Sequence, residues 1–258
     1  MHDLRFFFQH GLAFDDRYST QVSLKPPKTF KSALSITTNI LRLASAEVAS
    51  EQGVDLFNIF LAPFVKGLPK NEVKEELSQF LMSVNLTVPT GVSLGLETVL
   101  PTFLAEGKVY GGGVYADYPD ESHLIASAVL ECLSEREDSK PIFNPSIIVK
   151  VRPEALNDKD AESLLYEAHG LAAKGFPYFA NLNPEGQMCA SYTATGLRFA
   201  TDWKEDWELD AIRTGCVDNV TLNLPRAVYD AERDKSRFLK NLYDLSEKGL
   251  RALEIKYH

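Results

Sequence analysis

Residues 143–151 read "FNPSIIVKV", a short apolar run rich in β-branched residues that predicts a buried strand. A helical pattern follows over residues 158–174, and Gly175 is placed to end that helix. A second apolar run, "FPYFANL" at residues 176–182, predicts the next strand. A helix between two buried strands is typical of a parallel βαβ unit. This stretch therefore favours an α/β fold, either as a barrel or as an open sheet.

The sequence on both sides of this unit predicts more elements. Helical periodicity predicts further helices over residues 29–50, 68–86, 121–136 and 226–256. Gly53 is placed where the first of these helices would end. Further strands are predicted over residues 92–100, "VSLGLETVL", and 218–225, "DNVTLNLP". No linker or internal repeat is visible, so we predict one α/β domain over residues 1–258.

Composition excludes several classes of protein. The 258 residues are 45% hydrophobic and 24% charged, which is enough for a sizeable core and argues against disorder. The net charge of −9 argues against non-specific nucleic-acid binding. We find no signal peptide and no run of 18 apolar residues, so we expect a cytoplasmic protein that does not enter a membrane.

The cysteines predict no disulfide framework and no metal site. Cys132, Cys189 and Cys216 form no CxxC pair and no even set, as expected in a reducing cytosol. Cys189 stands in the loop "MCAS" after the strand predicted at 176–182. Without further information, it is best interpreted as a small buried residue. "GGGV" at residues 111–114 lacks the Lys-Ser/Thr of a phosphate-binding P-loop and is interpreted as a flexible loop.

Both ends of the chain begin or stop within a pattern. "LRFFFQHGL" follows almost directly on Met1, and "LSEKGLRALEIKYH" ends in a helical period. We interpret the chain as cut from something longer. The alternative is an ordinary compact protein with abrupt terminal elements.

Several stretches, in the same order, resemble the anaerobic (class III) ribonucleotide reductases, which are oxygen-sensitive glycyl-radical enzymes. They are "HDLRFFFQHGL", "LFNIFLAPFVKGL", "GFPYFANL", "MCAS" and "DWKEDWELDAIRTGCVDNVTLNLPRAVYDA". The most specific pieces are "YFANL…MC" and "RTG…VTLNLPRA". The resemblance runs from near residue 2 to about residue 245.

The resemblance implies a fold and a set of site residues. The fold would be part of a ten-stranded α/β barrel, with a helical region over about residues 1–90 and barrel elements over about 91–258. Cys189 would be the transient thiyl radical that takes the 3′ hydrogen of the ribose. Asn181, Asn223 and Arg226 would face the substrate. The alternatives are a loop-ordering role for Asn181, a turn for Asn223 and a surface charge for Arg226. Cys132 is interpreted as structural and Cys216 as packed.

The resemblance also implies partners. These are a ribonucleoside triphosphate substrate, a deoxynucleotide or ATP effector, a radical-SAM activating enzyme and a second copy of the chain. The helix over residues 29–50 resembles the one that pairs two subunits and helps to hold the effector in the family. A buried core helix is the alternative for this segment.

Some parts of the family's pattern are absent from the 258 residues. They lack the R-V-x-G-Y glycyl-radical motif, the four-cysteine zinc site and the cysteine expected before "HDL". Ala190 and Ser191 follow Cys189 where the family usually has Cys-Arg or Arg-Thr. We therefore expect no cofactor or metal on this chain, with the radical and the zinc in a missing C-terminal portion.

These departures leave more than one function open. We predict part of an anaerobic ribonucleoside-triphosphate reductase that is inactive alone. One alternative is a non-catalytic homologue that binds nucleotides or dimerises. Another is a different glycyl-radical enzyme, such as a formate-lyase relative, but those typically carry adjacent cysteines and lack "VTLNLPR".

Overall fold

The chain folds into two compact units in its computed structural model: Met1–Thr214 and Gly215–His258. The structure describes residues 1–14, 22–48, 51–135, 142–182, 190–199, 206–216 and 218–257. The single domain predicted over residues 1–258 stays a prediction.

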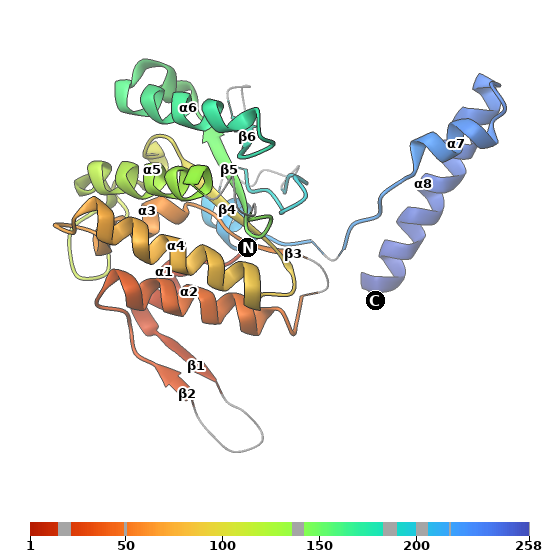
Figure 1. Cartoon of the computed structure of the whole chain (residues 1–258). Coiled ribbons are helices and arrows are strands. Elements are labelled where there is room, and N and C mark those ends of the chain that lie inside the picture. The colour runs from red at the N-terminus through yellow and green to blue at the C-terminus, as the bar shows by residue number, and fades with distance from the viewer. Residues whose placement is uncertain are drawn as a thin grey trace. The chain divides into compact units, whose positions relative to one another are not determined.

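The first unit contains most of the helices and strands (Figure 1). Its helices are α1 (Leu4–His10), α2 (Phe30–Ala44), α3 (Phe57–Leu61), α4 (Lys70–Thr87), α5 (Pro119–Glu135) and α6 (Lys159–Ala172). Its strands are β1 (Leu12–Phe14), β2 (Val22–Leu24), β3 (Glu51–Val54), β4 (Gly91–Glu97), β5 (Ser146–Val151) and β6 (Tyr178–Asn181). Short helical turns are η1 (Ala62–Phe64), η2 (Thr102–Leu104), η3 (Tyr115–Asp117), η4 (Pro153–Asn157) and the π-helical η5 (Glu208–Ile212). The second unit contains α7 (Leu224–Asp230) and α8 (Lys235–Tyr257).

The main sheet is parallel and its strands follow the order of the chain. The order is β3-β4-β5-β6, and each neighbouring pair is parallel. β1 and β2 form a separate antiparallel pair. A doubly wound sheet reverses its strand order at one point. In the described part of this sheet, each new strand lies on the same side of the one before it. The predicted α/β class is confirmed, and the winding is in one direction.

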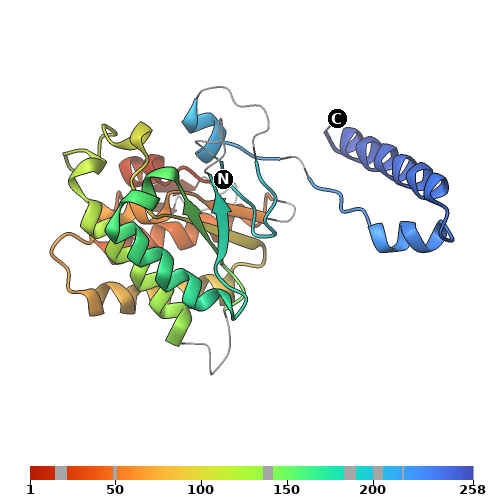
Figure 2. The same cartoon turned by 90° about the horizontal axis from the view of Figure 1, so that it is seen from above.

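Helices cover one face of this sheet. α2, α4, α5 and α6 lie side by side in that layer (Figures 1 and 2). A right-handed crossover to a strand that is always added on the same side places every helix on the same face. The sheet residues that point to the helices are apolar and buried: Val54, Val92, Leu94, Leu96, Ile147 and Val149. The hydrophobic core therefore lies between the sheet and this helix layer.

The opposite face of the sheet, which we call the polar face, has a different character. Its residues alternate with the apolar ones and include Gly53, Ser93, Gly95, Glu97 and Lys150. Met1 lies against Gly53, and the Ser93 hydroxyl donates a hydrogen bond to the carbonyl of Tyr192 at 2.8 Å. Irregular segments, and not the helix layer, therefore pack on the polar face.

Most predicted elements are confirmed with shorter ends. The predicted helices over 29–50, 68–86, 121–136 and 158–174 correspond to α2, α4, α5 and α6. The side chain of Thr29 caps α2, and the side chain of Asp158 caps α6. The predicted strands over 92–100, 143–151 and 176–182 correspond to β4, β5 and β6. Residues 111–114 form a turn in which Gly111, Gly112 and Gly113 have positive φ.

The interpretation of Gly53 as a helix end is wrong. α2 ends at Ala44, and Gly53 lies in β3 opposite Ser93 of β4. A Cβ atom at Gly53 would lie 2.2 Å from the Ser93 hydroxyl oxygen, so glycine is needed there for close packing. The parallel sheet consequently begins before residue 91.

The predicted strand over residues 218–225 is also wrong. Residues 218–223 are irregular, and Leu224 and Pro225 begin α7. The side chain of Asn223 caps this helix, and proline suits its first turn. A strand needs a hydrogen-bonding neighbour, and the described residues of the second unit contain no other strand.

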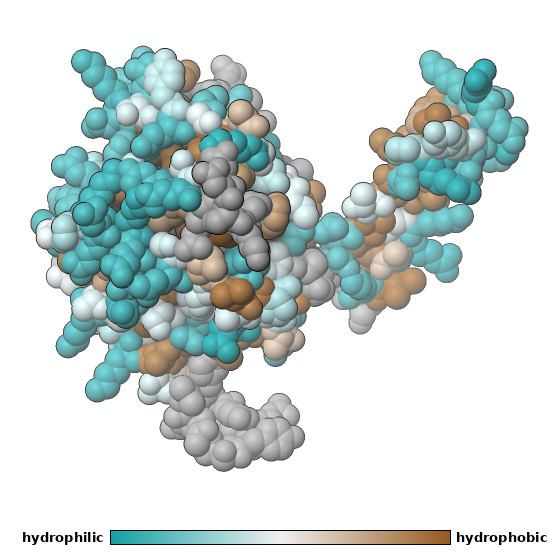
Figure 3. All heavy atoms as spheres, viewed as in Figure 1, coloured by the Kyte–Doolittle hydropathy of each residue, from teal (hydrophilic) through white to brown (hydrophobic). Residues whose placement is uncertain are grey.

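The second unit exposes much apolar surface. α8 has no buried residue, and hydrophobic residues lie on the surface of α7 and α8 (Figure 3). The largest exposed ones on α8 include Leu239, Tyr243, Leu250 and Ile255, each more than half exposed. Among the described residues, no helix is long and apolar enough to cross a lipid bilayer.

The close packing at Gly53 predicts a large effect of one methyl group. Gly53→Ala should lower the free energy of unfolding by about 1–3 kcal/mol, because the new Cβ overlaps the Ser93 hydroxyl. Gly170→Ala in α6 is the matched control, since no atom lies within 4 Å of its added Cβ. The control should gain about 0.5–1 kcal/mol from helix propensity. Urea unfolding of both variants measures the two effects, and a Gly53→Ala protein as stable as the parent would contradict this packing.

Candidate functional site

Four charged side chains meet where the strands of the main sheet end. Asp55 follows β3 directly, Glu97 is the last residue of β4, and Lys150 and Arg152 stand at the end of β5. Each of them is at most 5% exposed. The carboxyl ends of parallel strands are the usual place for a ligand site in α/β folds. We call Asp55, Glu97, Lys150 and Arg152 the buried charge network.

The charges in this network alternate and cancel. Arg152 donates two hydrogen bonds to the Glu97 carboxylate, at 2.6 Å from Nε and 2.8 Å from Nη2. The ammonium group of Lys150 pairs with Asp55 and lies 3.5 Å from Oε1 of Glu97. Two positive and two negative groups therefore share one water-poor region, as buried charges require.

The network controls the ionisation of Glu97. Burial alone would raise the pKa of the Glu97 carboxyl group, but the charges of Arg152 and Lys150 outweigh burial. The pKa of Glu97 is thus held below its ordinary value, and the group stays ionised at neutral pH. An ionised Glu97 in turn stabilises both cations.

Neutral side chains fix the strand ends around the charges. The Asn58 side chain accepts a hydrogen bond from the backbone N–H of Glu97 and donates to the Glu97 carbonyl, both at 2.9 Å. It also donates to the Ser122 hydroxyl at 2.9 Å, which connects α3 to α5. Thr98 donates to the carbonyl of Lys150 at 2.8 Å and joins β4 to β5. The backbone around the network therefore has little freedom.

Residues 190–199 lie on the polar face against this network. Ser191 is fully buried, and its hydroxyl oxygen lies 2.8 Å from Oδ2 of Asp55. The segment continues past Ser93 to the start of β3, where Thr195 donates to the Glu51 carboxylate at 2.8 Å from its hydroxyl and 3.1 Å from its N–H. Residues 191–195 therefore run from the carboxyl end of β3 towards its amino end, and residues 197–199 turn back antiparallel to them.

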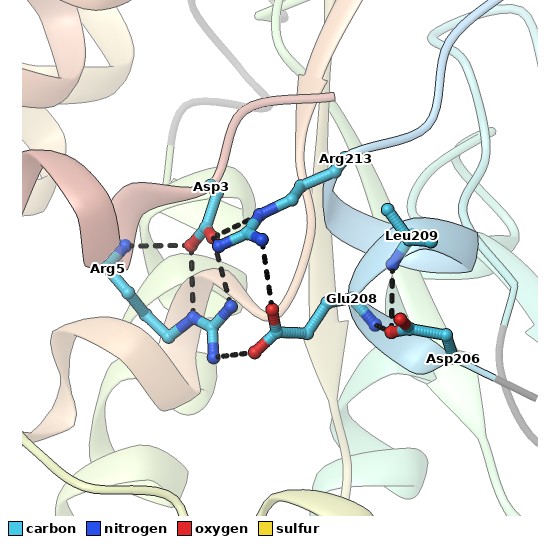
Figure 4. A network of polar contacts seen from close by, with 6 residues as sticks. All are labelled: Asp3, Arg5, Asp206, Glu208, Leu209 and Arg213. Atoms are coloured by element: carbon cyan, nitrogen blue, oxygen red, sulfur yellow. Dashed lines mark hydrogen bonds and ion pairs between the residues drawn. The ribbon is translucent and has the colours of Figure 1, made fainter.

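A second ionic cluster holds the segment before the Arg-Thr-Gly motif (Figure 4). Asp3 accepts from Arg5 and Arg213, and Glu208 pairs with the same two arginines, at 2.9–3.1 Å. The N-terminal ammonium group donates to the carbonyl of Thr214 at 2.9 Å. The beginning of the chain thus lies beside residues 206–214, about two hundred residues later in the sequence.

Stacked rings connect the two ionic groups. The guanidinium of Arg152 lies 5.5 Å from the centre of the Phe103 ring, and Phe103 stacks on Trp207 at 5.0 Å. The guanidinium group of Arg5 lies 4.7 Å from the Trp207 ring centre and donates a hydrogen bond to Glu208. Such cation–π contacts stabilise most when water is excluded. Segment 206–214 is therefore held to the strand ends at several points.

A cleft of about 520 Å³ opens beside the ends of β4 and β5. Its lining includes Asp120, His123, Glu154, Asp158 and Asp160. This many carboxylates repel a triphosphate, so the cleft does not suit a nucleotide's phosphate groups. No group of three or more His, Cys, Asp or Glu side chains that could hold a metal ion exists among the residues described here.

The sequence family of the chain follows from its whole length. The family model described as anaerobic ribonucleoside-triphosphate reductase matches residues 1–258. The chain belongs to this family. No curated protein sequence matches the chain.

Solved anaerobic ribonucleotide reductases share the fold of the chain. The Thermotoga maritima enzyme in complex with dATP and CTP is 14% identical, with a TM-score of 0.68 over 98% of this chain and 44% of that one. The same enzyme with dATP bound in the specificity site is also 14% identical, with a TM-score of 0.65 over the same shares. The same enzyme with citrate in the active site is 14% identical to this chain. Its TM-score is 0.68 over 98% of this chain and 47% of that one. The chain thus spans less than half the length of these structures.

The predicted site residues of this reductase-family chain lie in different parts of the structure. Cys189 lies outside the described residues. Asn181 is the last residue of β6. It lies two residues after Phe179 and therefore on the same face of the sheet. The ring centre of Phe179 is 4.5 Å from that of His169 in α6. That face is the helix-covered one, whereas Ser191 lies against the polar face. A substrate role for Asn181 stays a prediction.

Asn223 and Arg226 lie in the second unit. Asn223 caps α7 by accepting a hydrogen bond from the N–H of Arg226 at 2.9 Å. The Arg226 side chain is 74% exposed and pairs with Asp230 at 3.0 Å. Both roles agree with the turn and surface-charge alternatives, and substrate contact stays a prediction.

The structure decides between packing and exposure for two cysteines. Cys132 is 2% exposed in α5, so its structural role is confirmed. Cys216 is exposed, so its interpretation as a packed residue is wrong. It belongs to the irregular stretch after the Arg-Thr-Gly motif.

The sequence interpretation missed the buried charge network. A signal was present: Lys150 interrupts the apolar run "SIIVKV", and Glu97 ends the run "VSLGLE". A charge within a buried strand requires a partner, and an opposite charge at a neighbouring strand end is the simplest one.

The network predicts a pH-dependent stability that relies on Arg152. Because the pKa of Glu97 is lowered in the folded state, its stabilising effect is present above its unfolded pKa of about 4.3 and is lost as the pH falls through the folded value. Arg152→Met should cost about 3–5 kcal/mol at pH 7 and should move acid unfolding to higher pH. Urea and acid titrations followed by circular dichroism measure both effects.

The exposed pair of Lys31 and Glu76 provides the control for this prediction. The Lys31 side chain is 73% exposed, so Lys31→Met should change stability by less than about 1 kcal/mol. An Arg152→Met protein with the acid midpoint of the parent would rule out the assigned role of the network.

Proposed function

We propose that this chain is the part of an anaerobic ribonucleoside-triphosphate reductase that carries the thiyl cysteine, Cys189. The family match over the full chain and the shared fold with the solved reductases support this proposal. Among the alternatives, the family match favours a reductase over a formate-lyase relative.

The proposal includes a ten-stranded α/β barrel, of which β3 to β6 are one wall. Two observations support it. The described strands wind in one direction without a reversal, and α2, α4, α5 and α6 lie on the same face of the sheet. A barrel has these two properties, since its inner face is turned away from the helices. The polar face would then be the inside of the barrel.

The position of the residues after Cys189 carries the proposal. Ala190 and Ser191 are fully buried, and Ser191 lies against Asp55 at the carboxyl end of β3. Cys189 precedes them directly in the sequence. The carboxyl end of a parallel sheet, where Ser191 lies, is the place where α/β folds bind ligands.

The proposed chemistry uses the sulfur of Cys189 as a hydrogen-atom acceptor. The thiyl radical takes the 3′ hydrogen, so an S–H bond forms as the C3′–H bond breaks and the unpaired electron moves to the ribose. The 2′ hydroxyl then leaves as water after it gains a proton. An external reductant, formate or a thiol, supplies two electrons, and C2′ takes up a second proton. The S–H hydrogen finally returns to C3′, which regenerates the thiyl radical. A glycyl radical outside these 258 residues would generate the thiyl radical. The chain itself would supply positioning and exclusion of water.

The partners proposed for the chain are those of such a reductase. They are a ribonucleoside triphosphate, a deoxynucleotide or ATP effector, a radical-SAM activating enzyme and a second copy of the chain. The solved relative in complex with dATP and CTP supports nucleotide binding. The apolar side of α2 packs in the core of this chain, so α2 offers only its remaining surface for subunit pairing, whereas α8 offers exposed apolar residues.

A non-catalytic homologue that binds nucleotides or dimerises is the second candidate. Ala190 and Ser191, which replace the residues expected after Cys189 from the resemblance, favour it. The two candidates differ in whether Cys189 is needed for product formation.

Reconstitution of activity tests the main proposal. Incubated anaerobically with an activating enzyme, S-adenosylmethionine, nucleoside triphosphate and reductant, the chain alone should form no deoxynucleotide. When a polypeptide that carries the family's glycyl-radical segment is added, we expect product with the parent chain and none with Cys189→Ser. The O–H bond of serine is much stronger than the S–H bond of cysteine. A glycyl radical therefore cannot take the hydrogen atom of a serine hydroxyl group.

Cys216→Ser is the control for this experiment, since Cys216 is exposed and has no proposed role. It should retain product formation. Product from the Cys189→Ser chain would refute the thiyl assignment, and nucleotide binding without product in any mixture would favour the non-catalytic homologue.

Self-association is expected from the exposed apolar side chains of α8. Sedimentation velocity at concentrations on the order of tens of micromolar should reveal a dimer. At these concentrations, a dimer with a binding free energy of about −6 to −7 kcal/mol is populated. Leu239→Glu should weaken the dimer, because Leu239 is 53% exposed on this helix. Lys240→Glu, at the next and also exposed position, should have little effect. A strictly monomeric parent chain would contradict this expectation.

A further inference from the structure

The Ser191 hydroxyl group lies where three segments of the chain meet. It is 2.8 Å from Oδ2 of Asp55, which follows β3, and it also contacts the carbonyl of Ala211 in the π-helical turn. A hydroxyl group has one proton, so Asp55 and Ala211 share it. Ser191 therefore joins the segment after Cys189 both to the sheet and to the segment before the Arg-Thr-Gly motif.

Asp55 is itself held in one orientation. Its Oδ1 accepts the N–H of Leu56 at 2.9 Å, and its Oδ2 is paired with Lys150. Asp55 is 1% exposed, and Lys150 is fixed in turn by Glu97. A carboxylate with this many partners cannot rotate away from Ser191 without leaving a buried charge unpaired.

The sheet provides room for this carboxylate at Gly95. A Cβ atom at Gly95 would lie 2.1 Å from Oδ1 of Asp55. Any other residue in the middle of β4 would therefore displace the Asp55 side chain. The glycine that weakens β4 as a strand is explained by the position of Asp55.

We infer that Ser191 and Asp55 are positioning residues for Cys189, which fix the segment that follows it to the carboxyl end of β3. The inference rests on the proposed function of Cys189. Ser191 stands two residues after Cys189, so a fixed Ser191 restricts where the sulfur atom can reach. Hydrogen-atom transfer needs near-contact between the sulfur and the ribose, and an error of 1 Å is enough to slow such a step greatly.

Alkylation of the three cysteines tests this inference without any radical chemistry. The full chain is treated with iodoacetamide under native conditions, and peptide mass spectrometry follows Cys189, Cys216 and Cys132 separately. Ser191→Ala removes the hydroxyl, and Gly95→Ala displaces the Asp55 carboxylate while Ser191 is unchanged. Both variants should raise the alkylation rate of Cys189 by about threefold or more, because the segment opens more often.

Matched controls separate a local release from an effect of the substitution itself. Ser134→Ala removes an exposed hydroxyl from α5, and Gly170→Ala adds a methyl group in open space on α6. Neither should change the rate at Cys189. The rates at exposed Cys216 and buried Cys132 should stay constant in all four variants.

The outcomes of this experiment are distinct from those of the reconstitution assay. A Cys189 rate in Ser191→Ala within a factor of about 1.5 of the parent would overturn the inference. A rise at buried Cys132 together with the rise at Cys189 would also count against it, because that shows loss of the whole fold. If Gly95→Ala does not fold, Ser191→Ala decides. A changed alkylation rate together with an inactive reconstitution would leave the positioning role standing and reject the proposed catalysis.

Discussion

The buried ammonium group of Lys150 is the constraint on which the arrangement of the first unit depends. A charge removed from water costs several kcal/mol unless partners replace its hydration, and Lys150 is 1% exposed. Its partners come from two other strands, Asp55 after β3 and Glu97 of β4. A slip of one residue between strands would turn these groups to the apolar face. The charges therefore specify strand order and register more than they add stability.

The network also explains why the two faces of the sheet are covered differently. The helix layer packs on Val92, Leu94 and Leu96, whereas the alternate positions of β4 are Ser93, Gly95 and Glu97. A face with polar and small residues needs partners with free hydrogen-bonding groups, which irregular backbone supplies and a helix does not. Residues 190–199 meet that need through Ser191, the carbonyl of Tyr192 and Thr195.

Local patterns in the sequence predicted the helix layer well and the polar face poorly. The period of residues 158–174 and the cap at Asp158 define α6, because the signal lies within one element. β3 escaped prediction, since Gly53 resembles a helix end and the strand has only four residues, Glu51–Val54. The charge network depends on pairs such as Lys150 and Asp55, which are 95 residues apart. No local pattern specifies such a pair; only the topology of the sheet brings the two residues together.

The residues that follow Cys189 depart from the usual family pattern, and the packing gives a physical reason. Ala190 and Ser191 occupy positions where the family usually has Cys-Arg or Arg-Thr, and both are fully buried here. An arginine at position 191 would add a positive charge beside the pair of Asp55 and Lys150, in a network whose charges already cancel. A small hydroxyl residue instead satisfies Asp55 without disturbing that balance. In this chain, the choice of residue at position 191 and the charge of Asp55 therefore depend on each other, which couples the segment after Cys189 to the register of the sheet.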